Sequence, residues 1–198
     1  MTGDRWLIVG LGNPGPGYAS HRHNAGAMVA DVLAGRTGAR FRAGKFRAAV
    51  AEGRLAGHPV TLGKPLTYMN LSGGPVAGLA GYYRIPAGQL VVIHDELDLP
   101  FGTIRLKRGG GDNGHNGLRS VTTSLGTREY YRVRFGIGRP PGRMDPAVFV
   151  LRDFTAAERK ELPFLLDRAA DAAEALLADG LAAAQNAFHG GVPPAAGV

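Results

Sequence analysis

Short apolar runs and segments with helical spacing alternate along this chain, and that alternation limits the folds it can adopt. The runs RWLIVGL (5–11) and LVVIH (90–94) have the length and composition of buried strands. Three further strand regions are predicted: a hairpin over 46–63 that turns at Ala56-Gly57, an edge or half-exposed strand over 103–107, and a strand over 131–137.

Helices are expected between these strands at 25–33, from Ser72 as a capping residue to 83, at 116–125, and from 155 to 177. Thr155 and Glu158 form a capping-box pattern at the start of the last one. Interleaved strands and helices predict an α/β fold, a single three-layer domain over 1–190 in which helices surround a mixed twisted β-sheet. Residues 191–198 are predicted to form a disordered tail.

The composition excludes several classes of function. The chain has 198 residues and no cysteine, so it has no disulfide, no thiol nucleophile and no cysteine-ligated zinc. Its N-terminus is too polar for a signal peptide, and no run approaches the roughly 18 apolar residues of a membrane span. We therefore expect a soluble cytoplasmic protein with no membrane contact.

Positive charge is concentrated in one part of the sequence. The net charge is +7, and the segment 101–143 holds nine basic residues and two acids. From Met144 onward the balance reverses, with four basic residues and eight acids. Because this segregation would give the folded protein a basic face, it predicts a polyanionic partner.

Three glycine-rich loops contain five of the six asparagines. They are GLGNPGPGYASHRHNAG (10–26), KPLTYMNLSGG (64–74) and GGGDNGHNG (109–117). The first and third also hold His21, His23 and His115, and HDELD (94–98) ends a predicted strand. Because α/β proteins build their sites in loops at strand ends, we expect these segments to form one site.

The residues in these loops favour direct hydrolysis of an acyl bond by water. None of the four serines lies in a G-x-S-x-G motif, so serine-type covalent catalysis is poorly supported. A histidine held by a carboxylate can take a proton from water, and asparagine amides can orient the water or bind an oxyanion. An ester is the easier target, although spacing alone does not tell whether His21 or His23 would be the base.

Three other interpretations compete with hydrolysis. GLGNPG (10–15) fits the dinucleotide fingerprint, but Pro14, Pro16 and Gly17 interrupt the place where a helix should begin. A divalent metal could be held by His21, His23, His94, Asp95 and Asp98, although the H-E-x-x-H context is missing. The third interpretation is a nucleic-acid binder without chemistry, which would use the basic residues together with Tyr68, Tyr82, Tyr83, Tyr130 and Tyr131.

Five segments in order carry a resemblance to a known family. GLGNPGPGYASHRHNAG, KPLTYMNLSGG, HDELDLPFG, LKRGGGDNGHNGLRS and YYRVRFGIGRP resemble the signature segments of bacterial peptidyl-tRNA hydrolases, from about Leu7 to Gln185. The resemblance implies a single α/β domain, typically monomeric, that needs no cofactor and no metal. It implies cleavage of the ester between a peptide and the 3′ ribose of tRNA, which recycles tRNA from peptides that leave the ribosome early.

The resemblance also implies catalytic roles for particular residues. His23, in His23-Asn24-x-Gly26, matches the general base, and Asp95 matches the carboxylate that keeps it basic. Asn13 matches the residue that distinguishes N-blocked substrates from free aminoacyl-tRNA. Asn70 and Asn116 match the amides that bind the peptide–ribose end and the water.

Further positions match contacts with the tRNA. Tyr18 and Tyr68 match aromatic positions around the CCA end, Met69 an apolar wall, and His115 a histidine at the rim of the site that is not the base. The positions expected to hold the 5′ phosphate at the acceptor stem are Lys107 and Arg134, with Arg105 nearby on the same strand as Lys107.

Two positions depart from the family pattern. Phe101 replaces the second proline of an L-P-P-G turn, and Asp112-Asn113 stands where His-Gly or Glu-Gly is common. Both positions lie near the predicted site, so they affect the expected conformation of its loops and leave the predicted activity unchanged. The remaining alternative function is a tRNA- or ribosome-binding module without catalysis.

Overall fold

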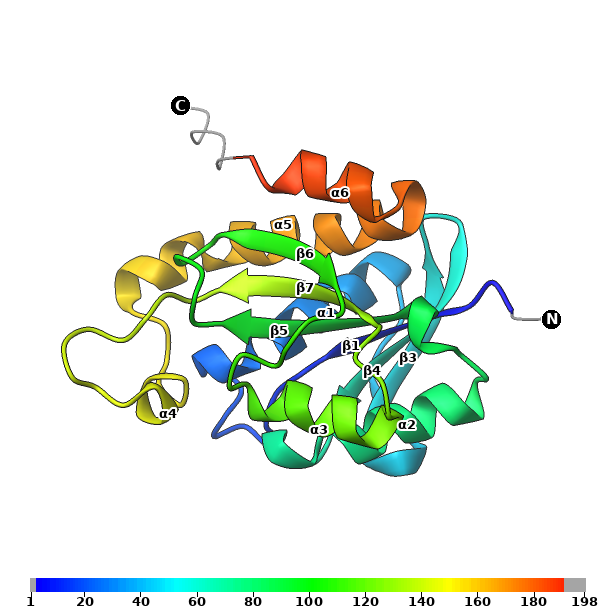
Figure 1. The fold of residues 1–198 in the computed structure, drawn as a ribbon, viewed down its shortest axis with the longest axis horizontal. Helices are drawn as coiled ribbons and strands as arrows, with labels where there is room; N and C mark the ends of the chain where they lie inside the picture. Colours follow the sequence, from blue (N-terminus) through cyan, green and yellow to red (C-terminus); the bar gives the residue numbers. More distant parts are fainter. Residues whose placement is uncertain (1–2, 191–198) are drawn as a thin grey trace.

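The computed structural model describes residues 3–190, which form one seven-stranded sheet with helices on both faces (Figure 1). The strands are β1 (Trp6–Gly10), β2 (Arg42–Ala43), β3 (Ala48–Leu55), β4 (His58–Pro65), β5 (Leu90–Glu96), β6 (Ile104–Arg108) and β7 (Tyr131–Gly136). The helices are α1 (Ala25–Thr37), α2 (Gly73–Tyr82), α3 (Asn116–Leu125), α4 (Pro146–Phe149), α5 (Ala156–Asp179) and α6 (Leu181–Phe188).

The sheet is mixed, in the order β2-β3-β4-β1-β5-β7-β6. The central strands β4, β1, β5 and β7 are parallel to one another, whereas β3 pairs antiparallel with β4 and β6 pairs antiparallel with β7. The predicted α/β fold with a mixed sheet is confirmed, as are the hairpin that turns at Ala56-Gly57 and the edge position of β6.

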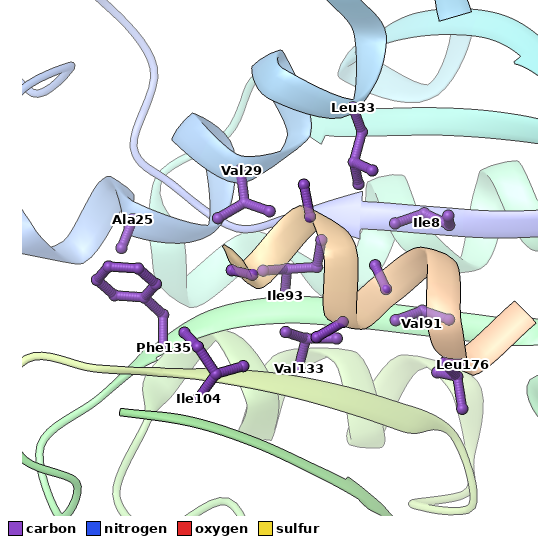
Figure 2. Packing of buried hydrophobic residues seen from close by; sticks show 14 of the residues in the cluster. Ile8, Ala25, Val29, Leu33, Val91, Ile93, Ile104, Val133, Phe135 and Leu176 are labelled. Atoms are coloured by element: carbon purple, nitrogen blue, oxygen red, sulfur yellow. The ribbon is translucent and has the colours of Figure 1, made fainter. Parts of the chain in front are cut away.

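Each face of the sheet has its own hydrophobic core. On one face, Ile8 of β1, Ile93 of β5 and Val133 of β7 pack against Val29 and Leu33 of α1 and against α5 (Figure 2). On the other face, side chains of β1 and β5 pack against α2 and α3, which lie side by side (Figure 1). The alternation along β1 therefore sends successive apolar side chains into opposite cores.

A close backbone approach fixes α1 against the sheet. A Cβ atom at Gly26 would lie 2.1 Å from the carbonyl oxygen of Ile93, so only glycine fits there. The amide of Leu11 donates to the same carbonyl, and that of Ala27 donates to the carbonyl of Leu11. The first turn of α1 is thereby held beside the ends of β1 and β5, where the glycine-rich loops meet.

The structure corrects some sequence-based expectations. Ser72 precedes α2, but its hydroxyl donates to the carbonyl of Met69 and does not cap the helix. The helix predicted over 25–33 continues to Thr37, and β2, α4 and α6 lacked a clear pattern in the sequence. The tail predicted over 191–198 lies outside the described residues, and among the described helices none is long and apolar enough to cross a membrane.

Candidate active site

The three glycine-rich loops and the end of β5 meet at one end of the parallel strands. A cavity of about 280 Å³ lies there, and its lining includes His23, Asp95, His115 and Asn116 together with Leu97, residues 145–147 and Val150 near α4. The C-terminal ends of β5 and β7 point toward α4 (Figure 1). Loops at the C-terminal ends of parallel strands are where such sheets place their sites.

Asp95, the penultimate residue of β5, binds two histidines at once. His23 Nδ1 lies 2.8 Å from Asp95 Oδ2, and His115 Nε2 lies 2.8 Å from Asp95 Oδ1. The carboxylate is nearly buried, with 2% of its side chain exposed, whereas 13% of the His23 side chain is exposed. Each carboxylate oxygen thus accepts one N–H from a different loop.

The hydrogen bonds define the tautomers. His115 lies at the N-cap of α3, where its Nδ1 accepts from the amides of Gly117 (3.1 Å) and Leu118 (3.3 Å), so its proton is on Nε2. His23 donates from Nδ1 to Asp95, and its Nε2 therefore carries a lone pair. His115 therefore donates to the Asp95 carboxylate and lines the main cavity, and its place at the rim of the site stays a prediction.

The electrostatics favour a basic His23 and an ionised Asp95. Burial, the largest influence, lowers the pKa of His23, but the charge and hydrogen bond of Asp95 outweigh it and raise this pKa above 6.5. Burial also acts to raise the pKa of Asp95, but the charges and N–H groups of His23 and His115 overcome it, so this pKa lies well below its ordinary value.

Of the metal ligands considered from the sequence, the structure brings His23 and Asp95 together but places His21 and Asp98 elsewhere. His21 pairs with Asp153 at 3.9 Å, and Asp98 pairs with Arg139. His94 Nδ1 donates to its neighbour's carbonyl oxygen at 2.7 Å, and burial together with His115 lowers its pKa to about 3. A different set, His23, Asp95 and His115, has ligand atoms within 4.8 Å of one another, the only such group among residues 3–190.

The loop that bears His23 is held by a distant part of the chain. The amide of Arg22 donates to the carbonyl of Arg152 at 3.0 Å, and that of His23 donates to Val150 at 2.9 Å. The buried guanidinium of Arg22 binds Glu158 at 2.9 Å and stacks 4.1 Å from the ring of Phe149. Residues 149–158 therefore fix the position of the histidine.

Asn13 acts as a connector between two loops. Its side-chain oxygen accepts from the amide of Met69 at 2.8 Å, and its backbone exchanges two 3.0 Å hydrogen bonds with the side chain of Asn24. Asn24 is buried, and its place in the His-Asn-x-Gly motif was the only sign of its importance in the sequence. The hydrogen bonds join the loop after β1 to the loop after β4.

The other predicted residues lie next to this connector. Asn70 and Asn116 together line a hollow adjoining the main cavity, and both are exposed. Tyr18 and Tyr68 meet edge to face at 6.1 Å, and the Tyr68 ring is 58% exposed. Two exposed amides and the exposed Tyr68 ring, with the half-buried Tyr18 against it, are therefore available to a ligand.

The predicted basic residues gather at the β6 edge of the sheet. Arg105 on β6 pairs with Arg134 on β7, and burial together with the charges of Arg134 and Arg132 lowers the pKa of Lys107. Arg134 donates twice to one carboxylate oxygen of Glu96, at 3.1 and 2.8 Å. Since Glu96 also lines the main cavity, this ion pair connects the basic edge to the site.

The departures from the family pattern have structural explanations. Asn113 has a φ of +51°, a conformation that glycine adopts most easily, and its amide donates to Glu96 at 3.1 Å and to Asp98. Phe101 packs 5.8 Å from the ring of Phe154. Sequence reasoning missed the parts played by Glu96 and Asn113, although HDELD and the list of loop asparagines contained both.

The segment GLGNPG (10–15) does not form the dinucleotide-binding turn considered from the sequence. After β1, the chain runs through a loop and the 3-10 helix Arg22–Asn24 before α1 begins at Ala25. A pyrophosphate site needs the helix to open directly from the glycine-rich turn. GLGNPG instead carries Asn13 toward Met69.

Comparison with known proteins identifies the family. The model of the family described as peptidyl-tRNA hydrolase matches residues 7–195. A Frankia casuarinae peptidyl-tRNA hydrolase is 65% identical over 189 residues, covering 95% of this chain and 96% of the relative. One from Frankia alni is 64% identical, covering 93% of each chain.

A solved structure of peptidyl-tRNA hydrolase from Acinetobacter baumannii superimposes with a TM-score of 0.87 at 37% identity, covering 95% of this chain and 96% of the other. These matches extend over nearly the full length of each protein. The chain therefore belongs to the bacterial peptidyl-tRNA hydrolase family and is an enzyme that hydrolyses peptidyl-tRNA.

Proposed function

We propose that His23 activates water for direct attack on the ester between the peptide and the tRNA 3′ ribose, with no covalent intermediate and no metal. The single observation that carries this mechanism is the 2.8 Å hydrogen bond from His23 Nδ1 to Asp95, since it leaves the Nε2 lone pair as the base. Asp95 would hold this tautomer and stabilise the imidazolium that forms.

The reaction runs in two steps. His23 Nε2 takes a proton from water as the oxygen attacks the ester carbonyl carbon, and the carbonyl oxygen becomes negative. The amides of Asn70 and Asn116 can donate to that oxyanion or hold the water. The bond between the carbonyl carbon and the ribose oxygen then breaks, and the imidazolium returns its proton to that oxygen. The peptide acid and the free tRNA are released.

Hydrolysis of an N-blocked aminoacyl-tRNA by the purified protein tests this proposal. We expect release of the N-blocked amino acid at a rate that is unchanged after exhaustive chelation, because water is activated by histidine alone. A rate that collapses on chelation and returns with a divalent ion would instead favour a metal held by His23, Asp95 and His115. Binding without product release would support the non-catalytic tRNA- or ribosome-binding module.

The substrate's tRNA would lie along the basic edge. The CCA end would meet Tyr18, Tyr68 and the neighbouring Met69, and the 5′ phosphate at the acceptor stem would meet Lys107 and Arg134, with Arg105 beside them. Positive charges at this edge suit a phosphate: burial first and then the charges of Arg134 and Arg132 lower the pKa of Lys107, and an anion would relieve the repulsion between these charges. We further propose that the protein acts as a cytoplasmic monomer without a cofactor.

Lys107→Ala and Arg134→Ala should each weaken tRNA binding and reduce the slope of log affinity against log salt by about 1. Fluorescence titration at several salt concentrations measures both quantities. Arg54→Ala, at the far hairpin, is the matched control and should change neither. Because Arg134→Ala also removes the partner of Glu96, its melting temperature is compared with that of the wild type. Unchanged affinity and slope in both variants would exclude the phosphate site.

A further inference from the structure

Two hollows continue from the catalytic asparagines along the joint between α2 and α3. The first, of about 360 Å³, is lined by Asn70 and Asn116 together with Ser120 and Ser124 of α3. The second, of about 420 Å³, shares Ser120 and Ser124 with the first and extends past Gly74 of α2 to residues 46–47. Since they share lining residues, the two hollows form one surface groove, which we call the α2–α3 groove.

The walls of the groove carry a buried polar group that lacks a partner. Thr67 lines the second hollow and is 4% exposed, yet its Oγ1 has no hydrogen-bond partner among the described residues. A buried hydroxyl without a partner is costly, and a ligand that moves the groove wall enough to reach Oγ1 can supply the missing bond. With Asn70 and Ser124, Thr67 offers uncharged groups that both donate and accept, as a peptide backbone requires.

The far rim of the groove combines exposed apolar surface with an uncommon backbone. Phe46 and Arg47 have φ values of +61° and +53°, and non-glycine residues rarely adopt this conformation outside sites that need it. Phe46 is 41% exposed, Leu71 is 52% exposed, and both line the second hollow. Phe46 is held there because its ring packs over Gly78, where a Cβ would lie 2.6 Å away.

The groove, whose lining includes Arg119 and Arg47, and the proposed phosphate-binding residues lie on opposite sides of the catalytic centre. Residues 46–47 connect β2 and β3 at one edge of the sheet, whereas Lys107 and Arg134 belong to β6 and β7 at the other edge. The scissile ester joins an anionic RNA to a peptide, so the two parts of the substrate must leave the site in different directions. Figure 1 shows α2 and α3 on the side of the sheet away from α5 and α6.

We propose that the α2–α3 groove binds the peptide part of the substrate, so that residues upstream of the ester run from Asn70 and Asn116 past Thr67 toward Phe46. This proposal rests on the function proposed above. Peptides released early differ in side chains, and a groove that offers hydroxyls and amides would bind their common backbone. Phe46 and Leu71 would contact side chains without selecting a particular one.

Gly74→Phe tests the groove by filling it. A Cβ at Gly74 meets nothing within 4 Å, so the ring can enter the second hollow without distorting α2. We expect kcat/KM for a pentapeptidyl-tRNA to fall about tenfold, or about 1.4 kcal/mol, relative to that for N-acetyl-aminoacyl-tRNA on the same tRNA. Gly81→Phe is the matched control, because it lies on the same helix, also has open space at Cβ, and does not line the groove.

Thr67→Val provides a second variant with little risk to folding. Because it removes an unpartnered hydroxyl at nearly constant volume, its melting temperature should equal or exceed that of the wild type. Its kcat/KM should fall for the pentapeptidyl substrate and stay unchanged for the N-acetyl-aminoacyl substrate. Retention of both rates by both variants would overturn the proposal, and if Gly74→Phe proved unstable, retention of both rates by Thr67→Val alone would overturn it.

Comparing the pentapeptidyl substrate with the N-acetyl-aminoacyl substrate distinguishes a failure of the peptide-groove proposal from a failure of the proposed catalytic function. Equal losses on both substrates, with weaker binding of deacylated tRNA, would overturn the peptide assignment and place RNA in the groove. Affinities measured with variants that also carry His23→Ala need no turnover. In the His23→Ala background, we expect pentapeptidyl-tRNA to bind more tightly than N-acetyl-aminoacyl-tRNA. If adding Gly74→Phe removes this difference in affinity, the result supports peptide binding in the α2–α3 groove even if catalysis follows another route.

Discussion

His23→Ala should lower kcat/KM for peptidyl-tRNA by about 10²- to 10⁴-fold while leaving the affinity for deacylated tRNA close to that of the wild type. General base catalysis is typically worth this factor, and the variant removes the Nε2 lone pair that we propose takes the proton. Single-turnover hydrolysis and a binding titration measure the two quantities separately.

His21→Ala is the natural control for that experiment. The two histidines are two residues apart on one loop, but His21 faces Asp153 at 3.9 Å while His23 binds Asp95 at 2.8 Å. We expect His21→Ala to keep most of its activity. If His23→Ala turned over normally, or if His21→Ala showed the larger loss, the assignment of the base would be wrong.

Asp95→Asn should reduce kcat/KM by about 10³- to 10⁴-fold, because an amide cannot accept N–H bonds from both histidines. If the amide nitrogen faces His23, it donates to Nδ1 and forces the proton onto Nε2, where the lone pair is needed. Rapid mixing with N-acetyl-aminoacyl-tRNA and quantification of the released amino acid measure the loss.

The pH profile gives an independent measurement on the same variant. In the wild type, kcat/KM should rise with pH through the raised pKa of His23, above 6.5, because only neutral His23 is a base. In Asp95→Asn the carboxylate charge that raises the pKa of His23 is lost, while the burial that lowers this pKa remains. The midpoint of the remaining activity should therefore shift to lower pH. Asp98→Asn, three residues farther along the chain, should leave the midpoint in place, and an unmoved midpoint in Asp95→Asn would contradict the role of the carboxylate.

The sequence predicted most of the fold because its strands are short apolar runs bounded by glycine and polar residues. Wherever tertiary contacts decide the structure, the sequence was less informative. Ser72 was predicted to cap a helix, but its hydroxyl donates a hydrogen bond to the nearby carbonyl of Met69 instead. The two-residue strand β2 has no pattern of its own and exists only through pairing with β3.

The candidate site shows the same limit. Loop composition located the histidines, Asp95 and the asparagines, but spacing left His21 and His23 equivalent. What separates them is the backbone bonding to residues 150 and 152, which no local pattern reports. The resemblance placed His115 at the rim of the site, and a sequence does not reveal that its Nδ1 accepts two helix amides and turns Nε2 toward Asp95.

The attachment of the His23 loop to residues 149–158 has a consequence for how the enzyme is made. Every residue proposed for catalysis lies before position 117, and the proposed phosphate contacts end at Arg134. A ribosome that has just exposed those residues has therefore delivered all the chemical groups but not the segment that positions the base. A copy of this protein abandoned at that point of its own synthesis would be an inactive peptidyl-tRNA, and a finished copy would be needed to hydrolyse it.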